Sequence, residues 1–117
     1  MIINKEELRE AILKQLEGET VRLEVEVHLQ KPAGREAEGL LAVTPSRLLF
    51  SHRPPFGEPE VTAYSRAALS ITDRKEDLWG ASMKAGAGDD SFELRRVAPP
   101  DFKQLCEELE APRPKRP

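Results

Sequence analysis

Few side chains in this sequence have the chemistry of a reactive or metal-binding group. The chain contains two histidines, His28 and His52, and one cysteine, Cys106. Neither histidine has a Cys, Asp or Glu at a recognised ligand spacing, and two histidines are too few for a three-histidine zinc site. Cys106 falls on the apolar face of a predicted helix, where a free cysteine packs as a small hydrophobe. We therefore expect no metal, no cofactor and no catalytic residue, and so no enzyme.

Three further stretches have the composition of ligand-binding loops but lack the required pattern. The run "DRKED", residues 73–77, lacks the spaced acids and central glycine of a calcium loop, so we expect a solvated turn. The run "GAGDD", residues 86–90, has neither the lysine nor the following helix of a phosphate-cradling loop. In "TPSR", residues 44–47, we expect Pro45 to shape a turn and Arg47 to leave it with its charged end in water.

Length, composition and charge limit the classes of protein that fit. The 117 residues suit one domain with a core of its own, and 38% hydrophobic against 33% charged residues suits a small barrel or sandwich with charged outer faces. The net charge of −3 argues against nucleic-acid binding, because phosphate contacts need a surplus of lysine and arginine. No stretch approaches the roughly 20 apolar residues of a membrane span. We expect a soluble, cytoplasmic protein.

The pattern of apolar residues changes period along the chain. Residues 4–17 read as a helix, with Asn4 as its cap, Glu7 as the reciprocal acid of a capping box, and Leu8 and Ile12 on its apolar stripe. From Thr20 the period becomes two, which predicts a strand over residues 20–30. Shorter apolar runs between turn residues predict strands over 38–44, 47–52, 61–64, 69–72, 78–85 and 91–97.

The chain ends with a second predicted helix and a tail. "PPDFKQLCEELE", residues 99–110, begins with prolines, which are tolerated at a helix start, and spaces its apolar residues at helical intervals. These residues are Phe102, Leu105, Cys106 and Leu109. The fold class that follows is mainly β with flanking helices: a seven-stranded antiparallel barrel or sandwich closed by a C-terminal amphipathic helix, with an extra N-terminal helix. Residues 111–117, proline-rich and basic, are expected to be a disordered tail.

The order of seven strands and one closing helix is that of the pleckstrin-homology (PH) superfold, and the local sequence resembles it as well. "EGLLAVTPSRLLFS", residues 38–51, resembles the hairpin of the second and third strands in bacterial PH-like and GRAM-like domains. "YSRAALSI", residues 64–71, resembles the segment that follows, and "FELRRV", residues 92–97, stands at the expected later position. The resemblance covers about residues 18–110, which would form the PH-like domain after an N-terminal helix in residues 1–17.

The resemblance implies that the loops after the first, third and sixth strands gather at the open end of a barrel. Five residues at these loops would form a phosphate-binding cluster there: Lys31, Arg35, His52, Arg53 and Lys84. The same loops also carry acids, at Glu36, Glu38, Glu58, Glu60, Asp89 and Asp90. The phosphoinositide signature has an Arg-x-Arg, whereas this chain has only "REA" at 35–37, so the pattern gives lipid binding less support.

We therefore expect a non-enzymatic binding module that acts through contacts with a protein partner or by self-assembly, because such a barrel leaves strand edges that can be extended. The N-terminal helix is expected to pack on its own barrel, with packing on a neighbouring copy as the alternative. The charged stripe could pair across a symmetric interface; it consists of Arg22, Glu24, Glu26 and His28. The alternative function is peripheral membrane association through anionic headgroups, with Lys31, Arg35, Arg53 and the tail residues Arg113, Lys115 and Arg116 as contacts.

Overall fold

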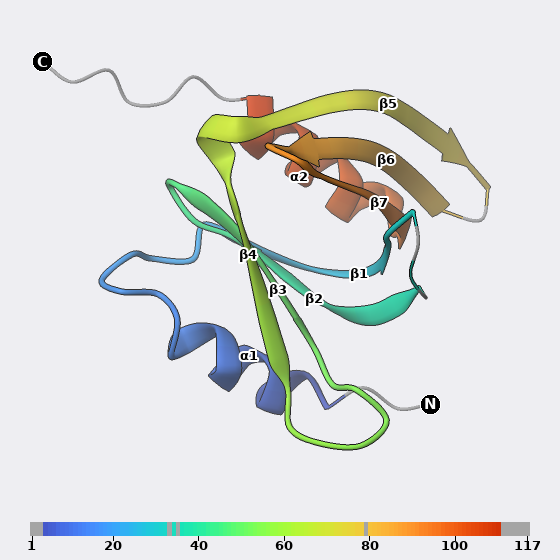
Figure 1. The fold of residues 1–117 in the computed structure, drawn as a ribbon. Coiled ribbons are helices and arrows are strands. Elements are labelled where there is room, and N and C mark those ends of the chain that lie inside the picture. The colour runs from blue at the N-terminus through green and yellow to red at the C-terminus, as the bar shows by residue number, and fades with distance from the viewer. Residues whose placement is uncertain (1–3, 33, 35, 79, 111–117) are drawn as a thin grey trace, which may run out of the picture.

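The computed structural model describes residues 4–32, 34, 36–78 and 80–110. The elements follow in the order α1 (Lys5–Leu13), β1 (Leu23–Gln30), β2 (Ala37–Val43), β3 (Arg47–His52), β4 (Glu60–Ser65), the short 3₁₀ helix η1 (Arg66–Ala68), β5 (Leu69–Asp77), β6 (Gly80–Ala87), β7 (Asp90–Val97) and α2 (Pro99–Glu110). Helix α1 lies against β2 and β3, whereas α2 packs against β1 and β6 (Figure 1).

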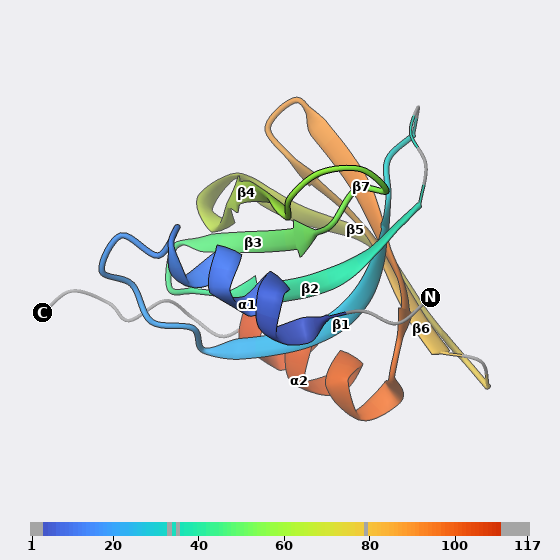
Figure 2. The same cartoon turned by 90° about the horizontal axis from the view of Figure 1, so that it is seen from below.

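The seven strands form one antiparallel sheet in the order β4-β3-β2-β1-β7-β6-β5, so β4 and β5 are its two edges. The sheet turns back on itself, and its inner face encloses a core to which both halves contribute. In Figure 2, α2 lies below the sheet and the β1–β2 and β6–β7 turns lie at the opposite, upper end. The predicted fold class, a seven-stranded antiparallel sheet with a helix at each end of the chain, is confirmed.

Strands β2 and β3 are buried on both faces, which explains why their sequences are continuous apolar runs. Four residues point into the main core: Leu41, Val43, Leu48 and Phe50. The alternate residues Leu40, Ala42 and Leu49 form a second cluster on the outer face, under Leu8 and Ile12 of α1. Helix α1 therefore packs on the chain's own sheet, as expected.

Helix α1 begins as predicted and ends earlier. The Asn4 side chain accepts a hydrogen bond from the backbone N–H of Glu7, which caps the first turn. The Glu7 carboxylate pairs with Arg53 at 3.2 Å instead of closing a capping box. The helix ends at Leu13 and not at residue 17, and the chain leaves it through Glu17 and Gly18, which both have positive φ. The strand predicted from residue 20 begins at Leu23.

The main error of the sequence prediction concerns β5. Residues 73–77 were expected to form a turn, yet they continue the strand and pair with β6 as far as Asp77 and Gly80. The turn lies beyond them and includes Leu78, which is 96% exposed and not the start of the sixth strand. Strand β6 correspondingly extends to Ala87. The charged residues are tolerated because β5 is an edge strand with much of its surface in water.

Helix α2 forms as predicted and closes one end of the sheet. Phe102 and Leu105 are buried in the main core, and Cys106 and Leu109 pack against it while partly exposed. The predicted tail, residues 111–117, lies outside the described residues. In the part of the chain that the structure describes, neither helix is long and apolar enough to cross a membrane.

Candidate functional site

The five residues predicted to form a phosphate-binding cluster do not share one environment in the structure. Lys31 is exposed in the β1–β2 turn, and Arg35 lies outside the described residues. Arg53 donates hydrogen bonds to the carboxylate of Glu7 and to the carbonyl of Gly57, both at 3.2 Å. The charge of Arg53 is therefore already opposed within the chain.

The other two members of this group lie in strands. His52 ends β3, and its ring stacks on Phe50 with 5.6 Å between ring centroids. Lys84 lies inside β6 and not in the loop after it, at register positions opposite Asp73 on β5 and Glu93 on β7. Acids therefore occupy the neighbouring positions on both sides of Lys84.

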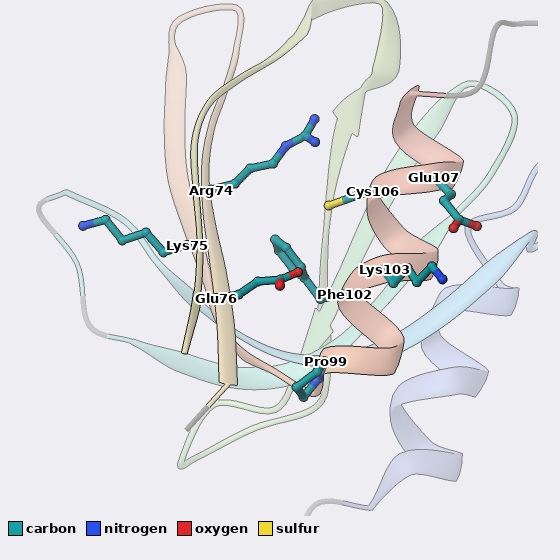
Figure 3. A pocket seen from close by; sticks show the side chains of 8 residues that line it. All are labelled: Arg74, Lys75, Glu76, Pro99, Phe102, Lys103, Cys106 and Glu107. Carbon is teal, nitrogen blue, oxygen red and sulfur yellow. The ribbon is translucent and has the colours of Figure 1, made fainter. Parts of the chain in front are cut away.

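A groove of about 620 Å³ separates β5 from α2. Arg74 and Glu76 of β5 face Phe102 and Cys106 of α2 across it (Figure 3). Lys75 lies between Arg74 and Glu76 in the strand, and its side chain points away from α2, as expected because alternate residues of a strand face opposite sides. The strand side of the groove is therefore charged, and the helix side combines the apolar Phe102 and Cys106 with the charged Lys103 and Glu107.

The register of the sheet explains why this space is open. Arg74 is opposite Met83 and Glu76 is opposite Ala81, and both partners on β6 are buried in the core. Arg74 and Glu76 therefore stand on the inner face of the sheet, where an apolar side chain would pack against α2. A charged side chain keeps its end in water and leaves such a space unfilled.

The electrostatics of the groove favour binding over catalysis. Arg74 forms an ion pair with Glu110 near the end of α2, and the hydrogen bond to Glu110 raises the pKa of Arg74. Burial raises the pKa of the Cys106 thiol, although the nearby Arg74 acts in the opposite direction. A thiol with a raised pKa stays protonated at neutral pH and is a poor nucleophile. At neutral pH the Cys106 sulfur therefore contributes to the groove mainly as a contact surface.

Sequence reasoning missed this groove because it placed residues 73–77 in a turn. No local signal distinguishes them, since Asp, Arg, Lys and Glu all have low strand preference. The usable signal was in the partner strand, where Ala81, Met83 and Ala85 alternate as one buried face. A strand inside a sheet has a hydrogen-bonded neighbour on each side, and β6 has β7 on one side and β5, which includes residues 73–77, on the other.

Arg47 is not solvated as expected, and that prediction is wrong. Its guanidinium donates to the carbonyl oxygens of Gln15 and Leu16 at 2.8 and 2.9 Å, and to the carboxylate of Glu19 at 2.8 Å. The hydroxyl and N–H of Ser46 also donate to Glu19. The hydrogen bonds from Ser46, followed by that from Arg47, lower the pKa of the Glu19 carboxyl. These contacts fasten the segment after α1 to the β2–β3 turn.

Arg66 has a similar structural role nearer α2. Its side chain is only 8% exposed and donates to the carbonyl oxygens of Thr44 and Glu108, both at 2.8 Å. The carboxylate of Glu108 also pairs with Arg22. The arginines at this end of the sheet therefore hold the β2–β3 turn, η1 and α2 together, and their charges are used within the chain.

The charged stripe of β1 and the segment before it is likewise engaged within the chain. Three members form ion pairs, Arg22 with Glu108, Glu24 with Arg9 and Glu26 with Lys5, and the His28 ring lies 3.2 Å from the Glu38 carboxylate. Two of these partners come from α1, which lies beside the stripe. The stripe contributes to holding α1 on the sheet, so it has fewer free charges for a second copy.

Metal binding finds no support within the described ranges. No group of three or more His, Cys, Asp or Glu side chains there gathers closely enough to hold a metal ion. The four buried side-chain atoms without a hydrogen-bond partner are spread over four residues, namely Glu36, Ser51, His52 and Tyr64. None of these four residues lines the groove.

Comparison with known proteins gives the fold alone. No family model matches this sequence, and no curated protein matches it. The chain is similar to the crystal structure of the C-terminal domain of an unknown protein from Leishmania infantum, with a TM-score of 0.63 and 15% sequence identity. The match covers 91% of this chain and 98% of that domain, so nearly the whole fold is shared.

Proposed function

We propose that this protein is a non-enzymatic, PH-like binding module that holds a segment of a partner protein in the groove between β5 and α2. The observation that supports the proposal is the groove itself, with Phe102 and Cys106 on one wall and Arg74 and Glu76 on the other. Its volume of about 620 Å³ is in the range of ligand sites, which is roughly 300–1,000 Å³.

The two walls indicate the chemistry of the segment. An apolar side chain of the partner would lie against Phe102 and Cys106, because this removes apolar surface from water on both sides. Arg74 and Glu76 provide a donor group and an acceptor group beside it, which suits the backbone or a polar neighbour of that side chain. Near-balanced charge makes the groove a poorer site for an anionic ligand.

The alternative of peripheral membrane association receives less support from the surroundings of its proposed contacts. Arg53 is paired with Glu7, and Lys84 lies between acids on the adjacent strands. Attraction to anionic lipid depends on several free cations near the surface, each contributing on the order of 1 kcal/mol. Sedimentation with anionic vesicles at low salt tests this alternative, and binding that is lost in Lys31→Glu would favour it.

A display experiment tests the groove directly. Random dodecamer peptides are selected on the wild-type protein, and each selected peptide is tested for protection of Cys106 from iodoacetamide. Cys106 is the only cysteine, so alkylation reports on the groove alone. We expect selected peptides to slow the alkylation and to carry an apolar residue next to a polar one.

Two variants with the same charge change provide the matched comparison. Glu76→Lys alters a side chain that faces into the groove (Figure 3), whereas Glu10→Lys alters an exposed side chain of α1 that does not line it. We expect Glu76→Lys to weaken peptide binding at least about tenfold and Glu10→Lys to change it less than about twofold. Peptides that bind Glu76→Lys as tightly as the wild type and leave Cys106 reactive would contradict the proposal.

A further inference from the structure

We infer that β4, the other edge of the sheet, is a dimerisation surface on which a second copy of this chain adds its own β4 in antiparallel orientation. Self-assembly through a strand edge would then occur at β4, on a surface separate from the groove between β5 and α2. In Figure 2, β4 lies at the outer margin of the β1–β4 layer, beyond β3.

The hydrogen-bond pattern shows which residues of β4 are free to pair. The backbone N–H of Arg66 donates to the carbonyl of Ser46 at 2.9 Å. These two residues stand opposite each other, next to the opposed pair Arg47 and Ser65 of β3 and β4, so they form a hydrogen-bonded pair of the ladder. In an antiparallel ladder the residues alternate, so Thr62 and Tyr64 also bond to β3. Val61, Ala63 and Ser65 therefore present their N–H and C=O groups away from the sheet.

Strand β4 lacks the features that protect an edge strand from pairing. Residues 61–65, "VTAYS", carry no charge and are rich in residues that favour strands. The register with β3 is continuous from Arg47 and Ser65 to His52 and Glu60, without a bulge. Ala63 and Ser65 are exposed, so a neighbouring strand has access.

A two-fold axis through Ala63 gives the best-matched pairing. It places Ala63 opposite Ala63 of the second copy and Val61 opposite Ser65, so that every outward-facing residue finds a hydrogen-bonded partner. An axis through Thr62 would instead place Ser65 opposite Pro59, which has no N–H to donate. The axis through Ala63 also keeps the two Glu60 carboxylates at opposite ends of the pair, so like charges do not meet.

The length of the strand limits the assembly to a closed dimer. Pro59 precedes β4 and η1 follows it, so the pairing cannot extend past about five residues on either side. The second edge, β5, has a bulge between Ile71 and Asp73 and inward charges at Arg74 and Glu76, which oppose strand addition. Because only the β4 edge is open, two copies pair the free backbone groups of their β4 strands with each other, and no open filament forms.

Sedimentation and disulfide cross-linking test the dimer. Wild-type protein is studied from about 10 μM to about 1 mM, the range expected for a small interface. In a Cys106→Ala background, Ala63→Cys places two thiols on residues whose Cα atoms would lie about 5.5 Å apart, within disulfide range. Ser70→Cys, exposed on the protected edge, is the matched control, and we expect the Ala63→Cys dimer to form at least about tenfold faster.

Two substitutions at Ala63 test the mode of contact. Ala63→Pro removes an N–H that points away from β3, so it spares the ladder of the monomer but not that of the dimer. Ala63→Lys brings two positive charges together at the axis, whereas Ser70→Lys makes a similar change on β5. We expect both Ala63 variants to raise the dimer dissociation constant at least about tenfold and Ser70→Lys to leave it within about twofold.

Either of two results would overturn the inference. One is a wild-type protein that stays monomeric at about 1 mM while Ala63→Cys oxidises no faster than Ser70→Cys. The other is a dimer that persists in Ala63→Lys and Ala63→Pro, which would place the contact elsewhere. Cross-linking requires no folding of the proline variant, so a misfolded Ala63→Pro leaves the test intact. Peptide binding to the groove is measured separately, so the two proposals fail independently.

Discussion

The two edges of the sheet, β4 and β5, are built in opposite ways. Strand β5 has nine residues, a bulge after Ile71 and two charged side chains, Arg74 and Glu76, on its inner face. Strand β4 has six residues, a continuous register and no charge between Val61 and Ser65. Bulges and inward charges are the means by which natural edges avoid pairing. The longer edge is therefore closed to strand addition, while the shorter one is open to it.

The protection of β5 has a second consequence. The same charges that discourage pairing keep β5 from packing closely on α2, and the space between them becomes the groove. One edge therefore offers free backbone groups and the other offers a surface for side chains. Substitutions in the half that carries β4, in the half that carries β5, and at Arg66 between them test this difference, from the largest expected loss of stability to the smallest.

The largest effect is expected at Gly39, in the half that carries β4. A Cβ atom there would lie 2.2 Å from the backbone oxygen of Ser51 and 2.9 Å from the ring of Phe50. Gly39→Ala therefore forces β2 and β3 apart, and we expect it to lower the free energy of unfolding by about 3 kcal/mol. Urea denaturation measures the change.

Gly86 is the matched position in the half that carries β5. A Cβ atom there meets the backbone oxygen of Asp90 at 3.5 Å, an ordinary contact. Gly86→Ala should change the free energy of unfolding by less than about 1 kcal/mol. If Gly39→Ala and Gly86→Ala lowered the free energy of unfolding equally, the close approach of β2 and β3 at Gly39 would not be the cause of the loss.

The next effect is expected at Arg66, which joins the two halves between β4 and β5. Arg66→Met removes the hydrogen bonds to the carbonyl oxygens of Thr44 and Glu108. We expect a loss of about 2 kcal/mol in the free energy of unfolding, since bonds from a buried charged donor are strong. Arg95→Met, at an exposed arginine whose contacts are 3.6–4.0 Å, is the control and should cost less than about 0.5 kcal/mol.

Glu19 tests how the covering helix is attached to the β4 half. Hydrogen bonds from Ser46 and Arg47 lower its pKa, so the folded state holds the ionised form more strongly than the unfolded state does. This stabilisation is present above the unfolded pKa of about 4.3 and is lost as the pH falls through the lower folded pKa. Glu19→Gln should therefore cost about 1 kcal/mol at pH 7 and progressively less toward pH 3.

The control for Glu19 is Glu10→Gln, on the exposed side of α1. Thermal unfolding of the wild type and both variants across this pH range gives the comparison. A wild type and Glu19→Gln that differ by the same amount at pH 7 and pH 3 would show that the carboxylate charge has no part in the attachment.

The smallest effect on stability, and the sharpest test of the comparison, comes from removing the protection of β5. Arg74→Thr with Glu76→Val replaces both inward charges by residues that favour strands. The Arg74 pair with Glu110 is partly exposed, so stability should change by less than about 1 kcal/mol. We expect new association in sedimentation that Ala63→Lys does not remove, because it arises at the other edge. A double variant that associates no more than the wild type would show that these charges do not protect β5.

Particular residues show how far the sequence predicted the fold. The cap at Asn4 and the period-two strand, with Val25, Val27 and Leu29 buried, are confirmed, because each depends on a local pattern of neighbouring residues. The helix end at Leu13 and the strand at residues 73–77 were missed. In both, the outcome depends on contacts with distant segments, namely Arg47 with the carbonyl groups after α1 and β6 with β5.

The candidate site was almost wholly beyond sequence reasoning. The loops that appeared basic contain Arg53, whose charge is opposed by Glu7, 46 residues away. The groove joins Arg74 and Glu76 to Phe102 and Cys106, and no spacing in the chain relates these pairs. Long-range charge pairing leaves no periodic signal, because either partner alone is an ordinary surface residue.

The sequence by itself determined most of the helices and strands and their order, since these follow from residue types and local periodicity. The tertiary structure decided which charges are free, which edge of the sheet is protected and where a groove opens. Those properties depend on strand register and on side chains brought together from distant parts of the chain. A shift of one residue in β5 would exchange Arg74 and Glu76 for Lys75 on the inner face, and the groove would have different walls.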